Sequence, residues 1–198
     1  MRVLPFRLLN LNVALAATIA LAGCQSLGTK DNVTVDYYTI SGNSTKELDK
    51  QIKSKGPRLN GSQHAIAVAR IRMLPKMTFG QTAKGCAITK ADVKVDAKVT
   101  LPRWSGRKNA NAELGRAWDN IDRYARLHEA THVAIAFRFA KDIEVGLLDL
   151  PAEPKCAVMR ERANVYVQRM LEEHDRAQRK FDDDEQKRLS MLRPRKAA

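Results

Sequence analysis

Two histidines four residues apart, His128 and His132, enclose a glutamate and form the pattern H-E-x-x-H. Side chains at positions i and i+4 of a helix project from one face, so both imidazoles can reach a single Zn²⁺ ion. Glu129 then lies beside them, where its carboxylate can take a proton from a water that the ion acidifies. The pattern therefore predicts a hydrolytic zinc site with two histidine ligands and Glu129 as the general base.

A catalytic zinc ion usually takes a third protein ligand and keeps one position open. If the chain reverses near residues 149–150, the position opposite residue 130 on a returning helix is near 169. His174 lies within about a turn and a half of that point and is the first candidate for the third ligand. Asp182 is the second candidate, although a straight helix places it farther along.

Alternatives remain open at these positions. The two helical histidines could instead be buried and hydrogen-bonded in the core. His174 could be an exposed histidine among acidic residues, in which case Glu172 or Glu173 is a reserve ligand. His64, at the start of an expected strand, has no partner by spacing and is expected to be structural or exposed.

Two long helices are expected to position the histidines. Apolar residues and both histidines recur at spacings of three and four from Leu114 to Ile143, which is the period of one helical face. A second stripe runs from Cys156 to Phe181, after a turn with Gly146 and two prolines. The short connection predicts a long C-terminal antiparallel helical hairpin that carries H-E-x-x-H on its first helix.

The first half of the chain is expected to form a small antiparallel sheet with a short helix. Ser44 and Glu47 form a capping box at the start of that helix. Residues 93–101 alternate strictly between apolar and polar, as a half-buried strand does, and Pro102 is expected to end this strand. The other expected strands are residues 33–40 and 65–71. The fold class is therefore α+β.

The composition bounds the class of protein. With 198 residues, 44% hydrophobic and 29% charged, the chain suits one globular domain. These values exclude a wholly disordered, collagen-like or polytopic membrane protein. The formal net charge of +13 favours anionic partners in general without choosing among them.

The N-terminal segment indicates the compartment. Residues 1–23 combine two arginines with an apolar run too short to span a membrane, which is typical of a secretory signal peptide. The run ends in Leu21-Ala22-Gly23-Cys24, which resembles the bacterial lipobox, so lipidation of Cys24 and a spacer over residues 24–32 are expected. An ordinary signal peptide with a chance cysteine is the alternative. Gln25, rather than aspartate, follows the cysteine, which favours the outer membrane, facing the periplasm. Nucleic acid is not an expected partner there.

Two further cysteines, Cys86 and Cys156, form an even pair in an oxidising compartment, which predicts a disulfide. Closing a loop of about 70 residues stabilises a fold by on the order of 4 kcal/mol in the chain-entropy model. The alternative, metal ligation by both cysteines, lacks a Cys-x-x-Cys spacing.

These features together resemble the bacterial "domain of unknown function 922" family, secreted proteins that are predicted to be zinc-dependent proteases. The resemblance covers almost all of residues 33–185, and His174 and Asp182 stand where the family has a histidine and a Tyr-Asp pair. The chain departs from the family at residues 185–188, which read Glu-Gln-Lys-Arg in place of Thr-x-His-Gly. If that family histidine binds metal, this chain lacks that ligand. The segments that carry the resemblance are Tyr37-Tyr38-Thr39-Ile40-Ser41-Gly42, Glu47-Leu48, Gly56-Pro57, Cys86, Thr100-Leu101-Pro102-Arg103-Trp104, Trp118, the H-E-x-x-H and Cys156.

The leading hypothesis is a lipid-anchored, periplasmic zinc metallopeptidase that acts on a peptide or protein substrate. Its protease-like domain is expected over residues 33–186, followed by a basic flexible tail over residues 187–198. The alternative is a non-catalytic envelope lipoprotein with a structural or vestigial metal site. Hydrolysis of a cell-wall amide is a weaker alternative, because the same zinc chemistry cleaves non-protein amides.

Overall fold

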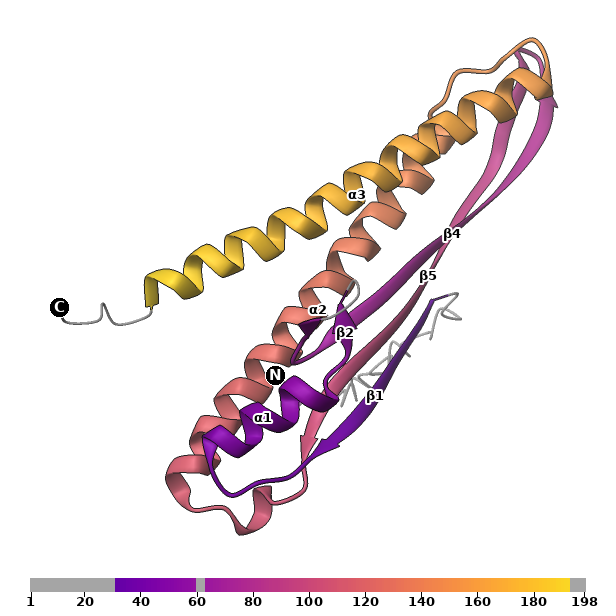
Figure 1. The fold of residues 1–198 in the computed structure, drawn as a ribbon. Coiled ribbons are helices and arrows are strands. Elements are labelled where there is room, and N and C mark those ends of the chain that lie inside the picture. Colours follow the sequence, from indigo (N-terminus) through magenta and orange to yellow (C-terminus); the bar gives the residue numbers. More distant parts are fainter. Residues whose placement is uncertain (1–30, 60–62, 193–198) are drawn as a thin grey trace, which may run out of the picture.

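The computed structural model describes residues 31–59 and 63–192 (Figure 1). The expected signal peptide over residues 1–23 and the lipidated Cys24 lie outside the described residues. In chain order the elements are β1 (Asn32–Ile40), α1 (Thr45–Lys55), β2 (Arg58–Leu59), β3 (Gln63–His64), β4 (Val68–Thr82), β5 (Gly85–Trp104), a 3₁₀ turn (Arg107–Asn109), α2 (Ala112–Leu148) and α3 (Cys156–Leu192). The α+β class expected from the sequence is confirmed.

The main sheet is mixed, so the expectation of a wholly antiparallel sheet was wrong. Its strand order is β1-β5-β4, with β4 antiparallel and β1 parallel to β5. β4 and β5 form a long hairpin, whereas β1 joins the opposite edge of β5. The chain between β1 and β4 contains α1 and the small β2–β3 pair, which is long enough for the crossover that a parallel pairing requires.

β5 continues through Pro102, which was expected to end it. Pro102 pairs with Tyr38 of β1, while β4 has no residue opposite it because the β4 pairing stops at Thr100. β5 therefore has a neighbour on one side only at this point, and a strand tolerates a proline there. The sequence pattern missed this because it does not show where a neighbouring strand stops.

The core lies between one face of the sheet and α2. Alternate residues of β5, from Val93 to Leu101, are buried, as the period-two pattern predicted. They pack against buried α2 residues that include Ala136 and Ile143. A second, smaller cluster joins α1 and β1 to the start of α2 around Trp104 and five other buried apolar residues: Ile40, Leu48, Ile52, Leu114 and Trp118.

Both predicted long helices are present, each 37 residues long. α2 starts at the N-cap Asn111, whose side chain accepts a hydrogen bond from the backbone N–H of Leu114. α3 runs back antiparallel to α2 and diverges from it toward its C-terminal end (Figure 1). It continues to Leu192, beyond the domain boundary expected at residue 186. No helix in the described part of the chain is long and apolar enough to cross a membrane.

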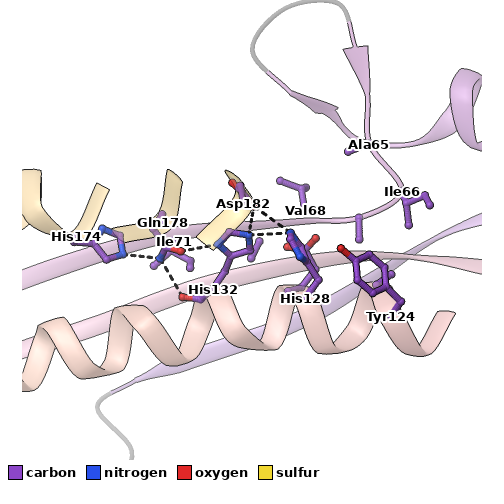
Figure 2. Close-up of a pocket in the computed structure, with 14 residues that line it drawn as sticks. Ala65, Ile66, Val68, Ile71, Tyr124, His128, His132, His174, Gln178 and Asp182 are labelled. Atoms are coloured by element: carbon purple, nitrogen blue, oxygen red, sulfur yellow. Dashed lines mark hydrogen bonds and ion pairs between the residues drawn. The ribbon is translucent and has the colours of Figure 1, made fainter. Parts of the chain in front are cut away.

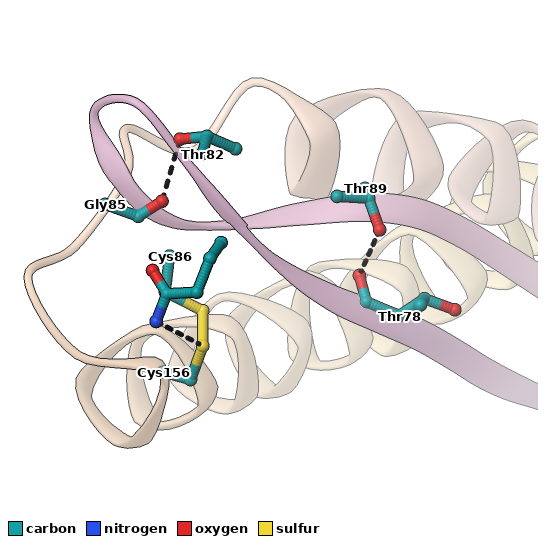
Figure 3. The surroundings of a disulfide bond; sticks show 7 residues. Thr78, Thr82, Gly85, Cys86, Thr89 and Cys156 are labelled. Carbon is teal, nitrogen blue, oxygen red and sulfur yellow. Dashed lines mark hydrogen bonds between the residues drawn. A yellow bond between two sulfur atoms is a disulfide. The ribbon is translucent and has the colours of Figure 1, made fainter.

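The start of α3 is fastened to the turn of the β4–β5 hairpin. Cys86, buried in the core, and Cys156, the first residue of α3, form a disulfide with a Cα–Cα distance of 5.1 Å (Figure 3). Beside it, Cys86 and Glu153 exchange two backbone hydrogen bonds of 2.7 and 2.9 Å. Gly85 has a φ of +115°, and a Cβ atom there would lie 2.5 Å from the carbonyl oxygen of Glu153. This glycine therefore allows both the turn and the close approach of the interhelical loop.

Candidate metal centre

The two histidines of H-E-x-x-H meet a carboxylate from the second helix. On α2, His128 and His132 lie one turn apart on the same face, and their Nε2 atoms are 3.1 Å apart. On α3, Asp182 places Oδ1 3.2 Å from Nε2 of His128 and 3.0 Å from Nε2 of His132 (Figure 2). The three side chains form a group that could hold a metal ion.

The size of this group fits a small divalent ion. A tetrahedral ion with ligand distances of 2.0–2.1 Å separates its ligands by roughly 3.3–3.4 Å. The observed separations of 3.0–3.2 Å therefore need an outward movement of only a few tenths of an ångström. His128, His132 and Asp182 could therefore hold a small divalent ion with little rearrangement.

The chain reversal explains why Asp182 joins the pair. Gln178 contacts His132, and Asp182 contacts His128, so the two helices face each other about a midpoint near residue 155. The sequence placed this midpoint near residues 149–150. Residues 149–155 instead form an interhelical loop against the hairpin, which moves each position of α3 along α2 by more than two turns.

His174, the first candidate for the third ligand, is not in the group but is linked to it through Gln178. Its Nε2 lies 2.8 Å from Nε2 of Gln178, whose Oε1 lies 2.6 Å from Nδ1 of His132. The reserve candidates, Glu172 and Glu173, pair with exposed side chains of α3 itself. Among the residues considered from the sequence, the geometry favours Asp182 as the third ligand.

Burial favours the neutral form of two histidines at the site, His128 and His174. It lowers the pKa of His128, and the neighbouring His132 lowers it further, against the opposing effect of Asp182. Burial also lowers the pKa of His174, with Asp175 opposing it. Neutral imidazole is the form that binds a metal ion, so these environments favour the binding form.

Glu129 lies beside the group in a different environment. Its side chain is only 5% exposed, and this burial raises the pKa of its carboxyl, while His132 and the backbone N–H of Ala69, which hydrogen-bonds to it, oppose the rise. A carboxylate whose pKa is raised holds a proton more readily than an ordinary one, which suits it to take up and return a proton.

The group lies in a cavity of about 450 Å³ between the two helices and the start of β4. Residues 65–69 form one wall, and Tyr124, one turn before His128, lies at one end of the labelled row of side chains in Figure 2. Phe181 packs against the rings of both histidines, with centroid distances of 4.9 and 5.0 Å. The wall and these apolar contacts leave the histidine side chains only 14–20% exposed, whereas the Asp182 side chain is 54% exposed, so the group stays accessible to solvent.

His64 and the pair Cys86 and Cys156 have structural roles. Nδ1 of His64 is 2.6 Å from the carbonyl oxygen of Gly56, which fastens the β2–β3 pair to the end of α1, so His64 is structural. Cys86 and Cys156 are joined in the disulfide and are not metal ligands.

Sequence reasoning missed Gln178 and Tyr124. Gln178 lies four residues after His174 and four before Asp182, so all three share one face of α3. Tyr124 lies four residues before His128 on α2. This regular spacing is the signal that could have found both residues.

The fold and site define an α+β domain in which a group of side chains that could hold a metal ion bridges two long helices. The chain belongs to the family described as "Bacterial protein of unknown function (DUF922)", whose family model matches residues 35–188. The resemblance stated from the sequence is thereby confirmed. No curated protein and no solved structure matches the chain.

Proposed function

We propose that this protein is a zinc-dependent peptidase. The observation that carries the proposal is the meeting of His128, His132 and Asp182 within hydrogen-bonding distance of one another, with the buried Glu129 beside them in one cavity. Two imidazole nitrogens and one carboxylate oxygen are a donor set that zinc takes in catalytic sites, with one position left for water or substrate. A site closed by four protein ligands would instead be typical of a structural zinc.

A zinc ion bound there supplies a Lewis acid that polarises a substrate carbonyl and lowers the pKa of a water molecule toward neutrality. Glu129 takes a proton from water in the cavity, and its raised pKa favours returning that proton to the leaving amine. The N–H of Ala69 holds the Glu129 carboxylate in place during both transfers. Tyr124 lines the same cavity, and its hydroxyl, which hydrogen-bonds to Glu185, would have to leave that carboxylate to donate to a substrate.

The proposal is tested with the protein from residue 25 onward, which retains every described element. We expect about one zinc per chain, and hydrolysis of members of a peptide library. His128→Ala loses both the zinc and the hydrolysis. Glu129→Gln keeps the zinc, because glutamine can still accept the Ala69 hydrogen bond, and loses a factor of roughly 10²–10⁴ in rate. Glu113→Gln, at the exposed start of α2, is the matched control and changes neither.

Two outcomes would overturn the peptidase. If protein carefully loaded with zinc does not retain a stoichiometric amount of it, the histidines of H-E-x-x-H do not have their proposed role as zinc ligands. Zinc binding without hydrolysis would indicate a metal-binding envelope protein that is not a peptidase. Hydrolysis that is unchanged in Glu129→Gln would show that the protein does not use this mechanism.

We further propose that Cys24 is lipidated and anchors the domain to the bacterial envelope, facing the periplasm and in the outer membrane. The support is the Leu-Ala-Gly-Cys segment after the apolar run, with Gln25 following it. The full chain should incorporate labelled palmitate and fractionate with outer membranes. Cys24→Ser should lose both properties. A wild-type chain that takes up no label would refute the anchor.

A further inference from the structure

Gln178 contacts three groups at the junction of the two helices. Its Nε2 is 3.0 Å from the carbonyl oxygen of His132 and 2.8 Å from Nε2 of His174, and its Oε1 is 2.6 Å from Nδ1 of His132 (Figure 2). A backbone carbonyl can only accept a hydrogen bond. The amide end beside it must therefore be the NH₂ group, which fixes the direction of every other bond that Gln178 makes.

This direction determines the tautomers of two histidines. Because Oε1 of Gln178 can only accept, Nδ1 of His132 carries a proton, and Nε2 of the neutral imidazole, 3.0 Å from Oδ1 of Asp182, then has a lone pair. Because Nε2 of Gln178 donates to His174, Nε2 of His174 is also unprotonated, and its proton lies on Nδ1, 3.2 Å from Oδ1 of Asp175. A continuous hydrogen-bond relay thus runs from Asp175 through His174 and Gln178 to His132.

His128 has no such support. Its Nδ1 is buried and has no hydrogen-bond partner among the described residues. Its Nε2 is 3.1 Å from Nε2 of His132, which the relay leaves unprotonated. In the metal-free protein the neutral His128 therefore carries its proton on Nε2 and donates it toward His132 and Asp182. The two histidines of the motif therefore have opposite tautomers, and only His132 has an unprotonated Nε2 that could bind a metal ion without first losing a proton.

We propose that Gln178 and His174 are positioning residues that hold the metal-free His132 as its Nδ1–H tautomer, with the Nε2 lone pair directed into the candidate metal centre. This inference rests on the proposed metal site for its purpose, but not for the tautomers, which the metal-free protein already has. It also gives His174 a role in the site without making it a ligand. A supporting partner of this kind typically changes metal affinity by a factor of 10–100.

The first measurement is the ¹⁵N spectrum of the histidine side chains in the metal-free protein from residue 25 onward, without a histidine tag. The chain has four histidines, so substitution of each assigns its signals. His132 and His174 should show protonated Nδ1 and unprotonated Nε2, and His128 the reverse. A proton on Nε2 of His132 in the metal-free protein would overturn the relay, whatever the protein does with zinc.

Two substitutions of Gln178 give opposite signatures. In Gln178→Glu both side-chain oxygens accept, so the hydrogen bond to the backbone carbonyl of His132 is lost, while His132 keeps its Nδ1 proton and His174 gains a proton on Nε2. In Gln178→Leu the Nδ1 of His132 loses its acceptor, so its two tautomers exchange. An Nε2 of His174 that stays unprotonated in Gln178→Glu would contradict the relay, because no donor would then remain beside it.

Zinc affinity is the second readout. Gln178→Leu should weaken binding about 10–100-fold, and Gln178→Glu should restore most of it, because the acceptor for His132 is present again. Gln168→Leu, on the exposed surface of α3, is the matched control and should bind as the wild type does. Unchanged affinity in folded Gln178→Leu refutes the positioning role. Absence of zinc binding in every protein refutes the proposed function, while the metal-free spectra still decide whether the relay exists.

Discussion

Reduction of the Cys86–Cys156 disulfide should remove a large part of the stability of this domain without dismantling the metal site. The bond closes a loop with a sequence separation of 70, and the loop-closure entropy of the unfolded chain makes this worth about 4 kcal/mol. Small domains are stable by roughly 5–15 kcal/mol in total. For a domain of this size the melting temperature should fall by roughly 8–16 °C.

The native state has other contacts that keep the start of α3 in place after reduction. The two backbone hydrogen bonds between Cys86 and Glu153 do not depend on the sulfur atoms, and Arg162 forms an ion pair with Glu153. The free energy of unfolding should therefore fall because the unfolded chain gains freedom. The folded protein should keep its zinc affinity at temperatures below the new melting point.

The assay is urea unfolding of the protein from residue 25 onward, oxidised and reduced, followed by circular dichroism. Cys86→Ala/Cys156→Ala is the control, and its stability should not respond to the reductant. A loss below about 1 kcal/mol on reduction would refute the entropic reasoning. If the reduced protein stays folded but no longer binds zinc, the Cys86–Glu153 hydrogen bonds and the Arg162–Glu153 ion pair are not sufficient to keep α2 and α3 in register.

Three further predictions concern single residues. Asp182→Ala should weaken zinc binding by more than about 100-fold, which is more than the loss of a supporting partner costs. The control Asp183→Ala, which changes the exposed neighbouring residue, should leave zinc affinity unchanged. Equal zinc affinities of the two variants would exclude Asp182 as a ligand. Asn111→Ala removes the N-cap of α2 and should cost about 1 kcal/mol in urea unfolding without changing zinc affinity; no loss of stability would show that the cap contributes nothing. Burial raises the pKa of Tyr38 to about 12 from its usual value of 10.0, so its contribution to stability is complete below pH 10 and is lost as the pH rises toward 12. The difference in unfolding free energy between wild type and Tyr38→Phe should therefore shrink by at most about 2–3 kcal/mol over that range, and a difference independent of pH would contradict the burial of the hydroxyl.

The elements of the fold could be predicted because their patterns are local. The strict alternation from Val93 to Leu101 is confirmed as the buried face of β5, and the apolar stripes are confirmed as α2 and α3. The Ser44 side chain accepts the backbone N–H of Glu47, as the capping box predicted, although the Glu47 carboxylate accepts from Asn43 and not from Ser44. Such signals depend on neighbours a few residues away in the chain.

The pairing of the strands could not be predicted in the same way. The direction of β1 relative to its neighbour depends on which edge of the β4–β5 hairpin it joins, and no periodicity records that. Pro102 shows the same limit, because its tolerance depends on where β4 stops pairing with β5. Both errors concern contacts between segments that lie far apart in the chain.

The third ligand illustrates how one long-range feature decides a site. Both His174 and Asp182 lie on the inward face of α3, so helical periodicity admits either of them. The choice depends on where α3 begins, and the disulfide and the Glu153 hydrogen bonds set that point at Cys156. With α3 starting there, Asp182 meets His128 and Gln178 meets His132. His174 is then one helical turn farther from the candidate metal centre, where its imidazole contacts Gln178 and lies outside the group that could hold an ion. The contacts at the start of α3, which are the disulfide and the loop hydrogen bonds together, thus select which side chains of α3 can serve the site.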